Sequence, residues 1–220
     1  MTVSVLLVDD HELVRDGIRQ LLSQTLDIKV VGCAASGEEA IQMVQSTVPD
    51  VVLMDINMPG IGGVEASLKI LRKFPTVKII ALTVRIEGPL PQQLLSAGVS
   101  GYLSKNCEFS ELLKAIRTVG LGKRYIANEI ASLIVCGQQQ QSACPFDHLS
   151  VREMQIVEYT LEGKSIQEIA EVLKISSKTV NTYRYRVHEK LGVKNDVELT
   201  RLASKHRLIQ DNSMIGKPLV

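Results

Sequence analysis

Carboxylates, a hydroxyl and an amine stand at the ends of short apolar runs in the first half of the chain. Asp9 and Asp10 follow one β-branched run, and Asp55 ends another. Thr83 and Lys105 follow later runs. Carboxylates brought together repel by roughly 4 kcal/mol per close pair at an effective dielectric near 20, so a divalent cation would stabilise them. Oxygen ligands with room for water favour Mg²⁺ over zinc.

A carboxylate held beside Mg²⁺ can attack phosphorus and form an acyl phosphate. Lys105 could then neutralise the added charge, and the Thr83 hydroxyl could donate a hydrogen bond to the phosphoryl group. Each residue alone has an ordinary alternative, because aspartates cap turns and helices, threonine fills strands and lysine is usually solvated. The combination of all five side chains favours a phosphoryl-transfer site.

These side chains meet only if their strands are parallel, because the carboxyl ends of parallel strands share one edge of a sheet. β-Branched runs do alternate with amphipathic stretches, which predicts a doubly wound, flavodoxin-like α/β fold. Five strands are expected, at 3–8, 28–34, 51–54, 78–83 and 101–104. Five helices are expected near 11–24, 36–45, 63–74, 90–97 and 108–119.

After residue 119 we expect no further strands, and from Leu149 onward the pattern is helical only. Capping-box spacings open several of the later helices, as in Ser150 with Glu153. Four helices are expected near 150–162, 165–173, 177–191 and 195–207. Four consecutive glutamines precede them and indicate a linker. The expected organisation is an α/β domain at 1–122, a linker with a short helix at 123–146, an all-α domain at 147–210 and a flexible tail at 211–220.

Residues 3–119 contain the motifs L-L-V-D-D-H-E-L-V-R, V-V-L-M-D-I-N-M-P-G-I-G-G, A-L-T and G-Y-L-S-K. In combination they resemble the receiver domain of bacterial two-component response regulators. The resemblance implies that Asp55 accepts a phosphoryl group from a histidine kinase or a phosphotransfer domain. It also implies that Asp10, Asp55 and the backbone carbonyl of Asn57 bind Mg²⁺, with Asp9 acting through water.

The same resemblance implies that Thr83 and Tyr102 form a switch pair, in which Tyr102 fills space that Thr83 leaves when it moves toward the phosphoryl group. An ordinary edge-strand aromatic is the alternative for Tyr102. Many receivers carry a proline after the lysine, often in a cis bond, whereas Lys105 precedes Asn106. A non-proline cis bond costs about 2.5 to 4 kcal/mol, so we expect a trans bond or a strained loop.

Residues 165–191 read as helix, tight turn and helix, the arrangement of a helix-turn-helix DNA reader. Asn181 can bond the edge of adenine, and the Thr182 methyl can contact that of thymine. The segment 176–190 carries four basic residues and one acidic residue. The expected DNA-binding residues are Lys178, Thr179, Asn181, Thr182, Arg184, Tyr185 and Arg186, with the three cations pairing with phosphates. A solvated face of a helical bundle is the alternative.

The later motifs are L-S-V-R-E-M-Q-I-V and I-A-E-V-L-K-I-S-S-K-T-V-N-T-Y-R-Y-R-V-H-E-K-L. They resemble the LuxR-type DNA-binding domain over residues 147–208. The whole chain is therefore similar to NarL/FixJ-type response regulators, and K-T-V-N-T-Y-R-Y-R with L-T-V-R-I-E-G-P-L-P resembles the GacA/UvrY group. This implies phosphorylation-activated binding to double-stranded promoter DNA as a homodimer, with dimer contacts in the last helix or in the receiver.

Composition agrees with two parts that have different partners. The chain has 25 basic and 24 acidic residues; residues 1–122 carry 11 and 13, and residues 123–220 carry 14 and 11. This balance excludes a uniformly basic nucleic-acid coat. No apolar run approaches the ~18 residues that span a bilayer, and no signal peptide is recognised, so a cytoplasmic location is expected. The four cysteines form no C-x-x-C pair, which indicates reduced thiols.

Two rival functions remain open. One is a Mg²⁺-dependent phosphohydrolase with Asp55 as its nucleophile and a helical protein-binding module, although no second acid/base residue or cap is evident; we therefore do not expect an enzyme. The other is a DNA binder whose receiver is never phosphorylated. His11, beside the acidic cluster, is expected to cap the following helix rather than bind metal.

Overall fold

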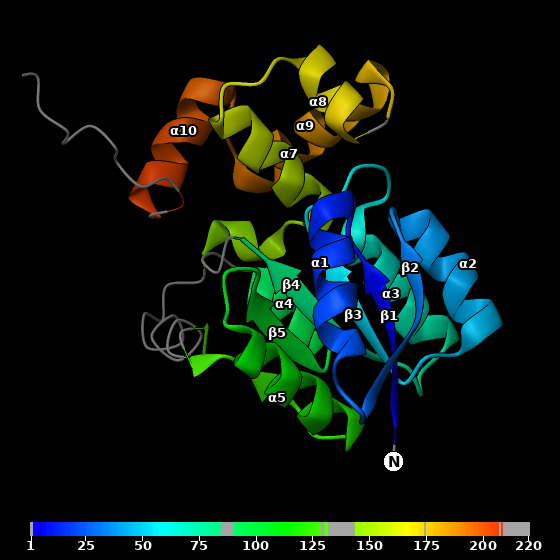
Figure 1. The fold of residues 1–220 in the computed structure, drawn as a ribbon. Helices are drawn as coiled ribbons and strands as arrows, with labels where there is room; N and C mark the ends of the chain where they lie inside the picture. Colours follow the sequence, from blue (N-terminus) through cyan, green and yellow to red (C-terminus); the bar gives the residue numbers. More distant parts are fainter. Residues whose placement is uncertain are drawn as a thin grey trace, which may run out of the picture. The chain divides into compact units, whose positions relative to one another are not determined.

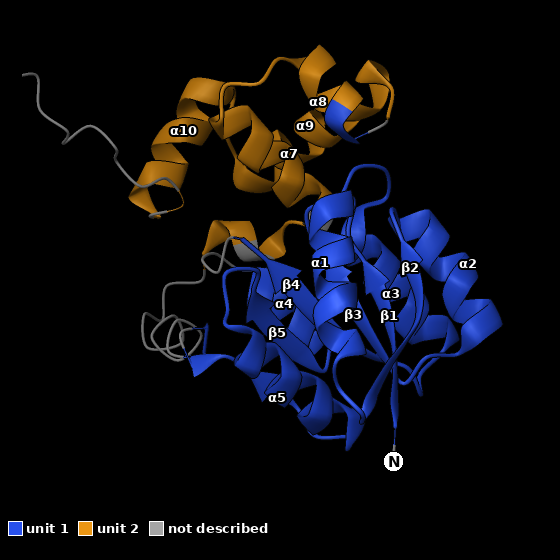
Figure 2. Cartoon of the chain, in the orientation of Figure 1, with its two compact units in different colours: residues 1–141, 172–174 blue, residues 142–171, 175–220 orange. Residues whose placement is uncertain are grey.

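The computed structural model describes residues 2–84, 90–128, 130–131, 144–173, 175–206 and 208. The chain divides into two compact units, residues 1–141 with 172–174 and residues 142–171 with 175–220 (Figure 2). The glutamine run and the predicted flexible tail lie outside the described residues.

Unit 1 is built on a parallel sheet with the strand order β2-β1-β3-β4-β5-β6. Its strands are β1 Val3–Val8, β2 Ile28–Ala34, β3 Val51–Asp55, β4 Lys78–Thr83, β5 Gly101–Ser104 and β6 Tyr125–Ile126. The five predicted strands are confirmed. Every residue of β3 is buried, as its continuous apolar run predicts for a strand covered on both faces.

The predicted count of five strands is wrong, because β6 adds a sixth strand beside β5. Gly101 pairs with Tyr125 and Tyr102 pairs with Ile126 in parallel register. The N–H of Ala127 then donates to the Tyr102 carbonyl, at 3.2 Å. A strand of two residues has no periodicity that a sequence could display, so only its pairing with β5 reveals it. It lies inside the range 123–146 that the sequence assigned to the linker.

Five helices cover the sheet, near the predicted positions: α1 Glu12–Ser23, α2 Gly37–Thr47, α3 Gly62–Lys73, α4 Leu90–Ser96 and α5 Phe109–Gly120. In Figure 1, α1 and α5 cover one face of the sheet, and α2 and α3 lie on the other. Right-handed crossovers require this separation, because the chain moves outward from β1 to β2 and then returns to β3 on the opposite side. The strand order therefore reverses between β1 and β3.

The described part of unit 2 contains the four predicted α-helices, preceded by the short 3₁₀ helix η1 Pro145–His148. They are α7 Val151–Leu161, α8 Ile166–Leu173, α9 Ser177–Leu191 and α10 Asp196–Lys205. Ser150 and Glu153 form the predicted capping box at the start of α7. Gly192 ends α9 in the left-handed conformation, with φ of 66°, which an L side chain would disfavour.

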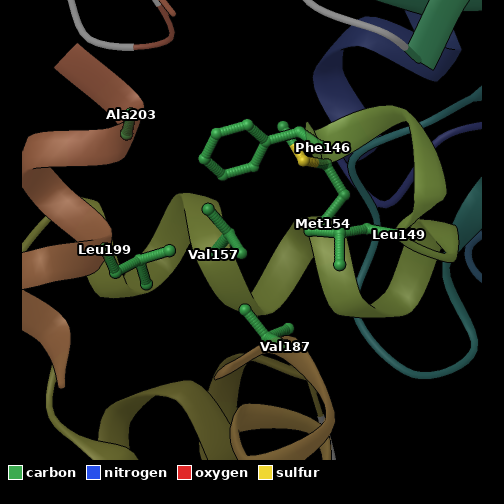
Figure 3. Close-up of a cluster of buried hydrophobic side chains, with 7 residues drawn as sticks. All are labelled: Phe146, Leu149, Met154, Val157, Val187, Leu199 and Ala203. Carbon is green, nitrogen blue, oxygen red and sulfur yellow. The ribbon is translucent and has the colours of Figure 1, made fainter. Parts of the chain in front are cut away.

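A buried cluster holds these helices together (Figure 3). Its members are Phe146, Leu149, Met154, Val157, Val187, Leu199 and Ala203. They come from η1 and the turn that follows it and from α7, α9 and α10, so the position of α9 depends on apolar contacts with several elements. Within the described part of the chain, no helix is long and apolar enough to cross a membrane.

Candidate functional site

The predicted acidic residues meet at the carboxyl edge of the sheet, where the strand order reverses. Asp9 and Asp10 follow β1, and Asp55 ends the adjacent strand β3. One ligand atom from each of these aspartates and from His11 lies within 4.8 Å of the others. Open α/β sheets bind ligands at this switch point. The structure thus brings together the side chains that the sequence singled out.

Lys105 reaches into the cluster from the end of β5. Its Nζ lies 2.8 Å from Oδ2 of Asp9 and 2.7 Å from Oδ2 of Asp55. The backbone N–H of Lys105 donates to the Thr83 carbonyl at 2.7 Å, which anchors the loop that carries the amine. No cis peptide bond occurs in the described residues, so Lys105 and Asn106 are joined by the expected trans bond.

Burial sets the electrostatics of this cluster. The side chain of Asp55 is only 1% exposed, and burial raises its pKa above the ordinary value despite the nearby lysine. For Lys105, burial alone would lower the pKa, but the contacts with Asp55 and Asp9 raise it. The lysine is therefore held as a cation against two enclosed carboxyl groups.

The donor set fits a hard divalent cation. Oδ1 of Asp55 accepts the Asn57 N–H at 2.9 Å, which holds the carboxylate beside the Asn57 backbone. Oδ1 of Asp10 is buried and makes no hydrogen bond of good geometry within the described residues, although Nδ1 of His11 lies 3.1 Å from it. A buried carboxylate oxygen without a well-formed hydrogen bond is stabilised when a cation or a water molecule binds it. Carboxylate and carbonyl oxygens are the ligands that Mg²⁺ prefers.

Two neighbours of the cluster were missed or misread in the sequence. His11 is the N-cap residue of α1, but its side chain makes no capping hydrogen bond. The prediction that the His11 side chain caps this helix is therefore wrong. Its Nδ1 instead lies 3.2 Å from Asp9 and 3.1 Å from Asp10. Arg15 donates to the backbone carbonyl of Asp9 at 2.7 Å. No spacing rule marks Arg15, because its partner is a backbone carbonyl, which every residue carries.

Thr83 and Tyr102 lie on one face of the sheet. In the parallel register Ala81 pairs with Tyr102 and Thr83 with Ser104, so all four side chains project to the same side. Thr83 is 1% exposed and Tyr102 is fully buried. Tyr102 is therefore a buried aromatic on the same face of the sheet as Thr83, and its strand β5 lies between β4 and β6 rather than at the edge.

The second half of the predicted site lies on α9. Val180 and Val187 are buried on one side of this helix, and Tyr183 and Leu191 are half-buried. Five of the proposed DNA-binding side chains are exposed together: Lys178, Asn181, Thr182, Tyr185 and Arg186. Thr179 is half-buried, and its N–H donates to the Ser176 hydroxyl at the start of the helix. This face of α9 can present an amide, hydroxyls and two cations to a ligand.

Arg184 differs from the other predicted DNA-binding residues. Its Nη2 donates to Oδ2 of Asp196, the first residue of α10. Its side chain is 22% exposed. Asp196 could not be singled out by spacing along the chain, because the pair bridges two helices across a turn.

Comparisons with known proteins identify both units. Residues 5–117 match the family described as Response regulator receiver domain. Residues 147–203 match Bacterial regulatory proteins, luxR family. The response regulator UvrY of Escherichia coli strain K12 is 50% identical over 208 residues, which cover 94% of this chain and 95% of UvrY. The response regulator GacA of Pseudomonas aeruginosa is 46% identical over 94% of this chain and 98% of GacA.

Solved structures agree with these matches. RcsB from Salmonella enterica serovar Typhimurium, bound to promoter P1flhDC in the presence of the phosphomimetic BeF₃⁻, has a TM-score of 0.67 and 27% identity. The alignment covers 93% of this chain and all of that one. The response regulator ChrA of a heme-sensing two-component system has a TM-score of 0.53 and 31% identity over 94% and 99% of the two chains. This chain therefore belongs to the two-component response regulators that join a receiver domain to a LuxR-type DNA-binding domain, and it is a transcription regulator.

Proposed function

We propose that Asp55 is the phosphoacceptor and that its donor is a histidine kinase or a phosphotransfer domain. The observation that carries the proposal is the 2.7 Å contact between the buried Asp55 carboxylate and the Lys105 amine. In the transfer, a carboxylate oxygen of Asp55 forms the new bond to phosphorus, and the bond between phosphorus and the donor histidine breaks. Lys105 then stabilises the negative charge that the acyl phosphate adds.

Asp10, Asp55 and the backbone carbonyl of Asn57 would hold Mg²⁺, with Asp9 contributing through water. The magnesium ion would neutralise phosphoryl oxygens during the transfer. The clustering of the Asp9, Asp10 and Asp55 carboxylates supports this assignment, as does the buried Oδ1 of Asp10, whose near neighbour His11 makes no well-formed hydrogen bond to it. The short contact between Asp9 and Lys105, at 2.8 Å, supports an indirect role for Asp9.

Thr83 and Tyr102 would couple phosphorylation of Asp55 to a change in packing elsewhere in the receiver. The Thr83 hydroxyl donates a hydrogen bond to the new phosphoryl group, and Tyr102 repacks into the space that Thr83 leaves. Their shared face of the sheet supports this coupling. Because β5 carries both Tyr102 and the start of the Lys105 loop, the repacking changes the surface formed by α4, β5 and α5.

The output would be binding of α9 in the major groove of promoter DNA. Asn181 and Thr182 read base edges, Lys178 and Arg186 pair with phosphates, and Tyr185, 70% exposed, contacts the duplex. Thr179 supports the start of the helix. Two phosphorylated chains would bind half-sites about one helical turn apart. Dimers of RcsB have been solved on DNA. We place the protein in the cytoplasm, because there it can meet both a phosphodonor kinase and promoter DNA.

Labelling with a small phosphodonor in the presence of Mg²⁺ tests this function. We expect one phosphoryl group per chain, none in Asp55→Ala, and tighter promoter binding only in the labelled protein. Asp16→Asn is a matched control, because Asp16 is an exposed acid on α1, and it should label normally. If the protein consumes many donor molecules per chain, faster than the aspartyl phosphate decays, it is a phosphohydrolase. Absence of label would identify a receiver that is not phosphorylated.

A further inference from the structure

A charged bridge joins α10 to α9, the helix proposed to enter the major groove. Its residues, Arg184, His188 and Asp196, are not among the exposed side chains of the DNA-reading face of α9. Arg184 and His188 lie one turn apart on α9, and both face Asp196 at the start of α10. Arg184 donates to Oδ2 of Asp196, and Nε2 of His188 lies 3.3 Å from Oδ1. One carboxylate therefore contacts two successive positions on the inner side of α9.

The bridge is partly enclosed by protein. Nε of Arg184, Nε2 of His188 and Oδ1 of Asp196 are buried atoms that make no hydrogen bond within the described ranges. Within the described residues, Arg184 is the hydrogen-bonding partner of this carboxylate, and the His188 ring lies against its other oxygen. The backbone N–H groups at the start of α10 add further attraction for an anion at position 196.

This bridge changes the charge that α9 offers to DNA. Lys178 and Arg186 are exposed, whereas the guanidinium of Arg184 is neutralised by Asp196. An arginine held in this way releases no counterion from DNA, because its charge is already compensated. Its geometric effect remains, since it ties the middle of α9 to the first turn of α10 across the tight turn at Gly192.

We propose that Asp196 is a positioning residue for sequence recognition: it withholds Arg184 from phosphates and fixes the orientation of α9 against α10. This inference rests on the proposed DNA-reading face of α9 and concerns which of its arginines takes part. With the bridge intact, binding depends on base contacts such as that of Asn181. With the bridge broken, the released arginine adds a sequence-independent phosphate contact, so affinity rises for any duplex and discrimination falls.

The test measures Kd against salt concentration for the full-length protein on two duplexes of equal length. One duplex is enriched from random DNA by the wild-type protein, and the other is random. Asp196→Asn should steepen the slope of log affinity against log salt by about 0.9, the amount for one phosphate contact. It should also reduce the ratio of the affinity for the enriched duplex to the affinity for the random duplex. We expect a reduction of at least about twofold, the smallest effect typical of separating two residues in contact. Asp196→Glu should restore both quantities toward wild type.

Two arginine variants complete the test. Arg184→Gln should leave the salt slope unchanged and lower the affinity ratio, whereas Arg186→Gln should reduce the slope by about 0.9 on both duplexes. The double variant Arg184→Gln with Asp196→Asn should show no steepening, because no arginine is released. Circular dichroism and thermal unfolding identify variants that have lost the fold. For these, Asp196→Ser and Arg184→Met, which also remove the charge, replace Asp196→Asn and Arg184→Gln in the comparison.

Opposite results overturn the inference. If Arg184→Gln reduces the slope as Arg186→Gln does, Arg184 is itself a phosphate contact. If folded Asp196→Asn keeps both slope and ratio, the bridge is a surface ion pair without a role in recognition. Failure of the underlying DNA-reading face looks different, because Arg186→Gln and Asn181→Ala would then also leave both quantities unchanged.

Discussion

Lys105 and Asp55 form the contact on which the receiver site depends, with 2.7 Å between the amine and the carboxylate oxygen. Asp55 ends β3 and Lys105 directly follows β5, and the two strands are separated in the sheet by β4. Because Asp55 is almost fully buried, the lysine is also its main compensating charge. The contact therefore contributes both to folding and to phosphoryl chemistry.

Lys105→Met should destabilise unit 1 in the absence of divalent cations. Removing one partner from a buried ion pair typically costs about 3 to 5 kcal/mol, because the remaining charge is left uncompensated. Adding Mg²⁺ should recover more stability in this variant than in wild type, since the ion replaces the missing positive charge. Urea denaturation with and without Mg²⁺ measures both effects. The exposed Lys123→Met is the control, and equal stability of the two variants would contradict the prediction.

Asp10→Asn should weaken Mg²⁺ binding at least about tenfold, because even the loss of an outer partner of a metal ligand costs that much. Titration calorimetry of the unphosphorylated protein measures the affinity directly. Asp16→Asn should bind Mg²⁺ like wild type, since its carboxylate lies on the exposed side of α1. Unchanged affinity in Asp10→Asn would remove Asp10 from the proposed ligand set.

Glu153 should make the stability of unit 2 sensitive to acid. Burial alone would raise its pKa, but hydrogen bonds from Lys190, at 2.7 Å, and Ser150 lower the pKa below the ordinary value of a glutamate. A lowered folded-state pKa stabilises the fold fully above the ordinary value, and the contribution is lost as pH falls through the folded-state value. Hydrogen exchange in α7, corrected for intrinsic rates, should therefore show less protection at roughly pH 3 than at pH 7.

Glu153→Gln is the matched variant for that measurement. It keeps the shape of the side chain but removes the charge that titrates, so its loss of protection on acidification should be smaller than in wild type. Glu189→Gln, which changes an exposed carboxylate on α9, should retain the wild-type response. An identical acid response in Glu153→Gln and wild type would show that this carboxylate does not set the pH dependence.

Asn181→Ala should cost about 1 to 3 kcal/mol on the preferred DNA sequence and much less on random DNA, as expected for a residue that bonds a base edge. Binding isotherms on the two duplexes at one salt concentration measure the difference. Glu189→Gln is again a suitable control on the same helix. Equal losses on both duplexes would instead assign Asn181 to the DNA backbone.

The local pattern of the sequence determined most of the architecture. Alternating apolar runs and amphipathic stretches placed β1 to β5 and α1 to α5, and capping residues such as Ser150 placed the start of α7. These features are local, because strand and helix periodicity and helix caps involve residues only a few positions apart. The chemical types of Asp9, Asp55 and Lys105 at strand ends were likewise enough to predict an acidic site at one edge of the sheet.

Only the tertiary structure decided the contacts between distant segments. The strand β6 is too short to show a period and exists because β5 offers it an edge. The ring of His11 faces carboxylates rather than capping α1, and Arg184 meets Asp196 across a turn. Such partners are chosen by how packed elements orient their side chains, and no spacing along the chain encodes that orientation.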